Sequence, residues 1–293
     1  MAVMELLNWL ILPWQYEFMV KALGVSALVG MVCAALSCYM ILKGWALMGD
    51  AVSHAVMPGV VIAYILQIPL AIGAFVFGIG SVVAIGLIQQ KTRIKEDTVI
   101  GLVFTGLFAL GLVLIAKIRS SLDLTHILFG NVLGIPDSEL VQTLIISLIT
   151  LVTLGVLGRD LVLFCFDPIH ARSIGINTSR LYYVLLSLLS LTAVAGIQAV
   201  GIILVVSMLI TPGATAYLLT DRFDHMTAIA IGCGVGSSLL GTYCSYYLDL
   251  PTGATIVLTQ TLLFITVLVF APKYGLISQS DQASDQADDG KLE

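Results

Sequence analysis

Charged residues are scarce in this chain. Only 11% of its 293 residues are Asp, Glu, Lys or Arg, whereas 59% are hydrophobic. A soluble domain carries about 25% charged residues, so this chain lacks the polar side chains that would cover a globular surface. The composition therefore excludes a soluble single domain and predicts a polytopic membrane protein.

The motifs of several function classes are also missing. The sequence contains no GxxxxGK[ST] phosphate loop, no HExxH pair, no dinucleotide fingerprint and no basic stripe for nucleic acid. Its five cysteines form no CxxC pair. We therefore expect a chain that is not an enzyme, has no catalytic residues, holds no permanently bound cofactor and binds no nucleic acid.

Long hydrophobic runs make up most of the chain. A helix that crosses a bilayer needs about 20 apolar residues. The stretch 181–220 is long enough for two spans if it breaks between Gly196 and Gly201, and single spans are expected at about 19–42, 47–67, 69–90, 98–116, 140–157, 226–247 and 254–270. The sequence thus predicts an all-α membrane protein with about eight or nine transmembrane helices, and a transmembrane domain over residues 19–275.

Three segments differ from this apolar body. Residues 1–18 begin apolar without a basic region or a small-residue cleavage site, which favours a helix at the membrane surface over a signal peptide. Residues 159–180 are a polar connection between two spans. Residues 276–293 form an acidic tail rich in Gln and Ser, which predicts disorder.

Basic residues mark one face of the predicted topology. With the segment KTRIKED (91–97) in the cytoplasm, ten lysines and arginines lie inside and three outside. The positive-inside rule then places the N-terminus outside and the acidic tail in the cytoplasm. Trp9, Trp14 and Trp45 lie at predicted ends of apolar runs, where we expect them to anchor the chain at the membrane surface.

Asp50 and His54 are ionisable residues inside an apolar run, GDAVSHAVMPG. Such residues are rare in membrane spans and are usually functional. Their i, i+4 spacing places both on one helix face, and a carboxylate with an imidazole suits manganese, iron or zinc. Alternatively, they cap the helix or pair with each other.

Two ligands from one chain make an incomplete metal site. A symmetric pair of chains would bring four protein ligands to a shared axis. Just beyond the pair, Pro58 and Gly59 are expected to break or kink the helix.

The polar connection contains a second candidate site. Asp167-Pro168 favours a turn, Ile169 to Ile174 favour a short helix, and Gly175 is a typical residue after a helix end. A compact cytoplasmic helix is suited to docking another protein, although an ordinary interfacial helix has the same pattern.

Several segments together resemble a known family. GWALMGDAVSHAVMPGVVIAYIL, LTHILFGNVLGI, FDPIHARSIGI, and VGIILVVSMLITPGATAYLLT through LPTGATIVL are similar to the membrane permeases of bacterial metal-uptake ABC transporters. The resemblance covers about residues 15–275. The manganese and iron importers of enterobacterial type are the most similar, and the zinc importers are more distant.

The resemblance implies a fold, partners and roles. The fold would be that of the vitamin-importer (type II) permeases in a bacterial inner membrane. The partners would be a second permease chain, identical or related, a cytoplasmic ATP-binding subunit and an extracytoplasmic metal-binding protein. Asp50 and His54 match the family's metal-coordinating pair, and Asp167, Ala171 and Gly175 match its ATPase-coupling segment.

We therefore expect a permease subunit of an ATP-driven importer of manganese, iron or zinc. The alternative is an ion-coupled secondary transporter that uses Asp50 and His54 as a proton or cation site. ATP-dependent uptake together with a stable ATPase partner distinguishes the first from the second.

Overall fold

The computed structural model describes residues 12–45, 47–118, 134–271 and 275, and these residues form helices and no strand. Nine helical segments in the described part are long and apolar enough to cross a membrane. In chain order they are α2 (Glu17–Lys43), α3 with α4 (Met48–Ala55 and Met57–Ile65), α5 (Leu70–Lys91), α6 (Glu96–Ile118), α8 (Asp137–Phe166), α10 (Thr178–Val200), α11 (Ile202–Leu219), α12 (Phe223–Leu248) and α13 (Thr252–Phe270). The all-α prediction is confirmed.

The long stretch 181–220 is two helices, as a nine-helix count requires. Helix α10 ends at Val200, and α11 begins at Ile202. Between them Gly201 has a φ of 88°, a left-handed backbone conformation that glycine adopts more readily than other residues. The glycine therefore separates the two spans.

The structure differs from the sequence prediction at the end of the fifth span. Helix α8 continues to Phe166, well beyond the predicted end near residue 157. Arg159 and Asp160 lie on its exposed side, while Leu161 and Phe164 are buried in the hydrophobic core. Because two adjacent charges occupy only one side of a helix, they do not end it.

Two short helices complete the described elements. The 3-10 helix η1 (Leu12–Gln15) precedes α2, and α9 (Pro168–Ser173) joins α8 to α10. Most of the predicted surface segment 1–18 and the whole acidic tail 276–293 fall outside the described residues.

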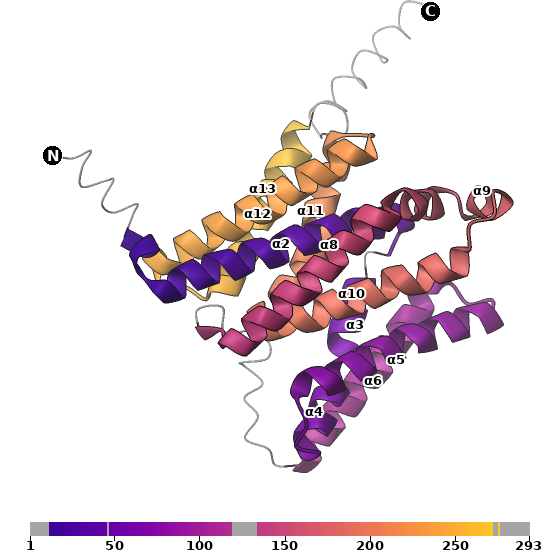
Figure 1. The fold of residues 1–293 in the computed structure, drawn as a ribbon, viewed down its shortest axis with the longest axis horizontal. Coiled ribbons are helices and arrows are strands. Elements are labelled where there is room, and N and C mark those ends of the chain that lie inside the picture. The colour runs from indigo at the N-terminus through magenta and orange to yellow at the C-terminus, as the bar shows by residue number, and fades with distance from the viewer. Residues whose placement is uncertain (1–11, 46, 119–133, 272–274, 276–293) are drawn as a thin grey trace, which may run out of the picture.

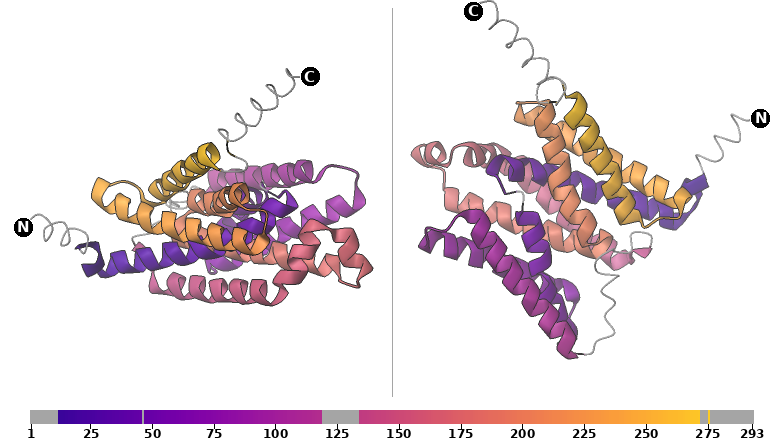
Figure 2. Two further views of the ribbon diagram at one scale, coloured as in Figure 1. Left: turned by 90° about the horizontal axis from the view of Figure 1, so that it is seen from above. Right: turned by 180° about the vertical axis from the view of Figure 1, so that it is seen from behind.

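Helix α2 runs through the middle of the bundle and packs against α8, α11 and α12 (Figure 1). Helices α3 to α6 form a group on one side, and α11 to α13 form a group on the other. Helices α2, α8 and α10 lie between the two groups, and the same division is visible from behind (Figure 2).

Small residues allow the central helices to approach closely. A Cβ atom added to Gly30 of α2 would lie 2.9 Å from the carbonyl oxygen of Gly234 in α12. Nearby, the hydroxyls of Ser26 and Thr242 lie 3.2 Å apart across the same interface. Close backbone contact and interhelical hydrogen bonds are the usual sources of helix association in lipid.

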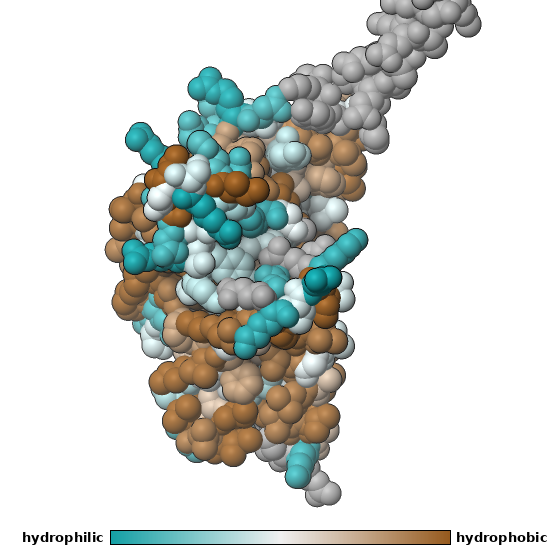
Figure 3. All heavy atoms as spheres, turned by 90° about the vertical axis from the view of Figure 1, so that its right-hand side faces the viewer, coloured by the Kyte–Doolittle hydropathy of each residue, from teal (hydrophilic) through white to brown (hydrophobic). Residues whose placement is uncertain are grey.

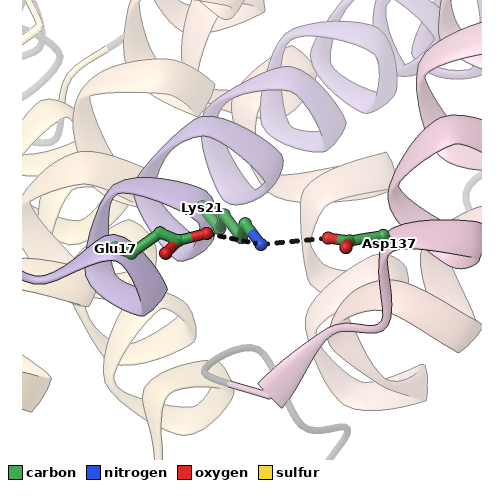
Figure 4. A network of polar contacts seen from close by, with 3 residues as sticks. All are labelled: Glu17, Lys21 and Asp137. Atoms are coloured by element: carbon green, nitrogen blue, oxygen red, sulfur yellow. Dashed lines mark hydrogen bonds and ion pairs between the residues drawn. The ribbon is translucent and has the colours of Figure 1, made fainter.

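One polar link joins the starts of α2 and α8. Lys21 Nζ lies 3.0 Å from Glu17 Oε1 and 3.0 Å from Asp137 Oδ1 (Figure 4). Both carboxylates are largely exposed to solvent, so the link orients the two helix ends and contributes little to stability.

Candidate metal site

One face of helix α3 is only partly covered by the described residues. Six of its eight residues are buried, and only Asp50 and His54 are not. Their side chains are 37% and 20% exposed, respectively. The two ionisable groups therefore lie together on a face of α3 that the described residues leave partly uncovered.

The two side chains are close enough to bind one ion. His54 Nε2 lies 3.3 Å from Asp50 Oδ1. Two ligand atoms that are each about 2.1 Å from a common ion, at about 90–110° to each other, lie about 3.0–3.4 Å apart. The observed separation also permits a direct hydrogen bond or ion pair between the two residues.

Aromatic rings enclose the histidine on one side. The His54 ring lies 5.2 Å from the Phe104 ring and 5.1 Å from the Phe108 ring, both on α6. Its Nδ1 atom is buried and has no hydrogen-bond partner among the described residues. The rings restrict the imidazole, so that Nε2 is the nitrogen that faces Asp50.

The described residues of one chain do not form a complete metal site. Within the described residues, no group of three or more His, Cys, Asp or Glu side chains could hold an ion. A divalent ion at Asp50 and His54 would therefore need further ligands from water or another chain.

Pro58 and Gly59 lie directly after this pair. Helix α3 ends at Ala55, and Pro58 lies in the first turn of α4, where its missing amide hydrogen is tolerated. Gly59 packs directly against the backbone of Gly73 in α5, where there is no room for a side chain. This contact fixes α4 against α5 immediately after the candidate site.

The second candidate segment is the short helix α9. Asp167 Oδ1 accepts hydrogen bonds from the backbone amides of Ile169 and His170, both at 2.9 Å. Ala171 is fully buried, and Gly175 has a φ of 87°. Asp167 therefore caps the start of α9. Ala171 packs the helix against the rest of the protein, and Gly175 turns the chain toward α10.

Helix α9 projects beyond the ends of α8 and α10 (Figure 1). Two apolar side chains at this point are exposed, Phe166 at the end of α8 by 61% and Ile169 of α9 by 80%. Viewed from this end, hydrophilic residues gather across the face and hydrophobic surface flanks them (Figure 3). This end of the bundle therefore has a polar surface from which two exposed apolar side chains project.

The sequence model of the ABC 3 transport family matches residues 15–271, nearly the whole described chain. The chain belongs to the ABC 3 transport family. With nine candidate spans in its described part, this family member is a multi-pass membrane permease.

Named relatives and solved structures agree with this assignment. The permease is 60% identical to the manganese transport system membrane protein MntB of Synechocystis sp., over 93% of this chain and 89% of that one. It is 51% identical to the chelated iron transport system membrane protein YfeD of Yersinia pestis, over 88% and 87% of the two chains. The structure of PsaBC from Streptococcus pneumoniae in complex with Fab is similar, with a TM-score of 0.80, 38% identity and coverage of 89% and 94%.

Proposed function

We propose that this chain is the permease subunit of an ATP-driven importer of divalent transition metals, with manganese and iron as its main cargo. The family assignment supports the transport role. The observation that carries the proposal is the Asp50–His54 pair, two metal-binding groups 3.3 Å apart on the open face of a helix within a membrane span.

The ion moves past this pair as cargo. The carboxylate supplies a hard oxygen ligand and the imidazole supplies a nitrogen ligand, a combination that suits first-row divalent metals. Because only two ligands come from each chain, the ion is held weakly by one chain and more strongly by two. A second permease chain, identical or related, places its own pair opposite and completes the site.

Helix α9 is the contact with the ATPase. It lies outside the membrane spans, is capped by Asp167 and exposes apolar residues at its protruding end. A cytoplasmic ATP-binding subunit docks there, and its conformational change alters the relative positions of α8 and α10. This movement switches the metal site between the two sides of the membrane.

The topology follows from the basic residues. Lys43, Lys91, Arg172 and Arg222 lie at or near helix ends on the α9 side, and this side faces the cytoplasm of a bacterium. The N-terminus then faces outward and the acidic tail faces inward. Metal reaches the outer side from an extracytoplasmic binding protein.

Manganese is the first candidate for the cargo, because the relative with 60% identity is named for manganese. Relatives with 51% identity are named for iron, so iron comes next. Zinc binds the same ligand types and is the third candidate.

Reconstitution tests the proposal directly. The permease, its ATPase and its binding protein are placed in liposomes, and uptake of radioactive manganese is measured with ATP, without ATP, and with excess iron or zinc. We expect ATP-dependent uptake that iron inhibits more strongly than zinc. Uptake that persists without ATP would instead support an ion-coupled secondary transporter.

A further inference from the structure

A cavity of about 170 Å³ with a mixed polar and apolar lining lies at the α9 end of the bundle, apart from the Asp50–His54 pair. It is bounded by the C-terminal part of α5, the end of α8, helix α9 and the N-terminal part of α10. Its polar lining consists of Gln89, Arg172, Thr178, Ser179 and Tyr182. Among the residues that the structure describes, none that lines the cavity is acidic.

The cavity contains a buried donor without an acceptor. Gln89 Oε1 accepts a hydrogen bond from the Tyr182 hydroxyl at 3.1 Å. Gln89 Nε2 is also buried, and it has no hydrogen-bond partner among the described residues. A buried amide N–H without an acceptor is destabilising, so this group favours a ligand that supplies an acceptor oxygen.

Arg172 gives the cavity a positive charge. Its Nε donates to Thr178 Oγ1 at 2.8 Å, which fixes the guanidinium at the cavity wall. The described residues include no carboxylate that forms an ion pair with it. A second cation lies close to the cavity. Lys43 Nζ is 4.4 Å from the centre of the Phe164 ring, and Phe164 lines the cavity.

The first turn of α10 adds to the positive electrostatic potential of the cavity. Thr178 and Ser179 are its first residues, and the amides of a first helical turn have no partner within the helix. Together, a guanidinium, a buried amide and hydroxyl groups at a helix start form a set of donors suited to an oxyanion.

The level of the cavity in the membrane indicates the source of that oxyanion. Gln89 ends one candidate span, Phe164 lies two residues before the end of another, and Thr178 begins a third. Three span ends therefore meet at the cavity. This is the level at which phospholipid headgroups lie, just outside the hydrocarbon core.

We propose that this cavity binds the phosphate group of an anionic phospholipid in the leaflet on the α9 side. Arg172 and Gln89 hold the phosphate oxygens, and the acyl chains lie along the apolar surface of the neighbouring helices. A bound headgroup would hold α5, α9 and α10 together beside the segment that contacts the ATPase.

The test measures lipid binding to the purified, delipidated permease–ATPase complex by native mass spectrometry. The probes are phosphatidylglycerol, phosphatidylcholine and inorganic phosphate. The variants are Gln89→Leu, Arg172→Gln and the milder Ser179→Ala. The control is Arg159→Gln, which removes an exposed charge from α8 outside the cavity.

We expect phosphatidylglycerol to bind in preference to phosphatidylcholine. Gln89→Leu and Arg172→Gln should each weaken its binding by about tenfold, because each removes a hydrogen bond to a charged group. Ser179→Ala should weaken it less, and Arg159→Gln should leave it unchanged. Ser179→Ala keeps the proposal testable if the other two variants do not fold.

Three results would overturn the proposal. Equal phosphatidylglycerol binding by all variants would exclude the cavity as the lipid site. Inorganic phosphate binding as tightly as the lipid would assign the cavity to a soluble oxyanion. Unchanged lipid binding with loss of the ATPase in Arg172→Gln would assign the cavity to the subunit interface.

Discussion

Asp50 Oδ1 lies 3.3 Å from His54 Nε2, on a face of α3 that the described residues leave partly open. Both the chemical type of the two side chains and their shared position on α3 bear on what this pair can do. A carboxylate and an imidazole suit the same kind of divalent ion, and both side chains lie on a face that the described residues leave partly open.

The first prediction concerns the charge of Asp50. Asp50→Asn keeps the shape and one oxygen ligand but removes the negative charge. We expect ATP-dependent manganese uptake to fall by at least about tenfold, because changes that only perturb a metal's ligands already lower affinity by about 10–100-fold. Asp160→Asn, on the exposed side of α8, is the matched control and should transport normally.

The second prediction concerns the contact of α4 with α5. Gly59→Ala places a methyl group against the backbone of Gly73. We expect it to destabilise the protein by about 1–3 kcal/mol, the range for overpacked sites, as measured by thermal unfolding in detergent. Gly24→Ala is the control, because a Cβ atom at Gly24 would meet no atom within 4 Å. Equal melting temperatures for the two variants would contradict the close packing described for Gly59.

The third prediction concerns the cap of α9. Asp167→Ala removes the acceptor for the amides of Ile169 and His170. Loss of an N-cap side chain costs about 1 kcal/mol, so α9 should become less ordered and metal-stimulated ATP hydrolysis by the complex should fall. Asp167→Asn retains an acceptor oxygen and should preserve most of the activity. If both variants behave alike, the carboxylate acts by its charge and not as a cap.

The fourth prediction concerns a hydrogen bond between α8 and α10, whose loss should lower stability only slightly. Thr150 of α8 and Thr192 of α10 share a buried hydrogen bond of 3.2 Å. Thr150→Val should lower the free energy of unfolding by only about 0.6 kcal/mol, the average for such bonds between membrane helices. Thr153→Val is the control, because the Thr153 hydroxyl donates to Ile149 within its own helix. A much larger loss would mean that α8 depends on this bond for its position.

Several elements could be predicted from short stretches of the sequence alone. Hydrophobic length predicted the spans, and the stretch from Gly196 to Gly201 predicted a break, which the structure places at Gly201. Asp167, Pro168 and Gly175 gave a short helix, which the structure places at Pro168–Ser173. In each case the determining interaction lies within a few residues of the chain.

Other features depend on contacts between distant segments. Trp45 stands at the end of an apolar run, but it is only 1% exposed and packs edge-on against Tyr182 of α10. The continuation of α8 depends on which side of the helix its charges occupy. The cavity at Gln89 combines residues from four helices. None of these could be derived from hydrophobic length or residue spacing.

We propose that two chains hold one metal ion between them through Asp50 and His54. Electron paramagnetic resonance of manganese bound to the complete transporter tests this most directly, because it reports both the number of ions and the nitrogen atoms coordinated to them. We expect one manganese ion for each pair of permease chains, with imidazole coupling that disappears in His54→Ala. One ion in each chain, or unchanged nitrogen coupling in His54→Ala, would contradict it.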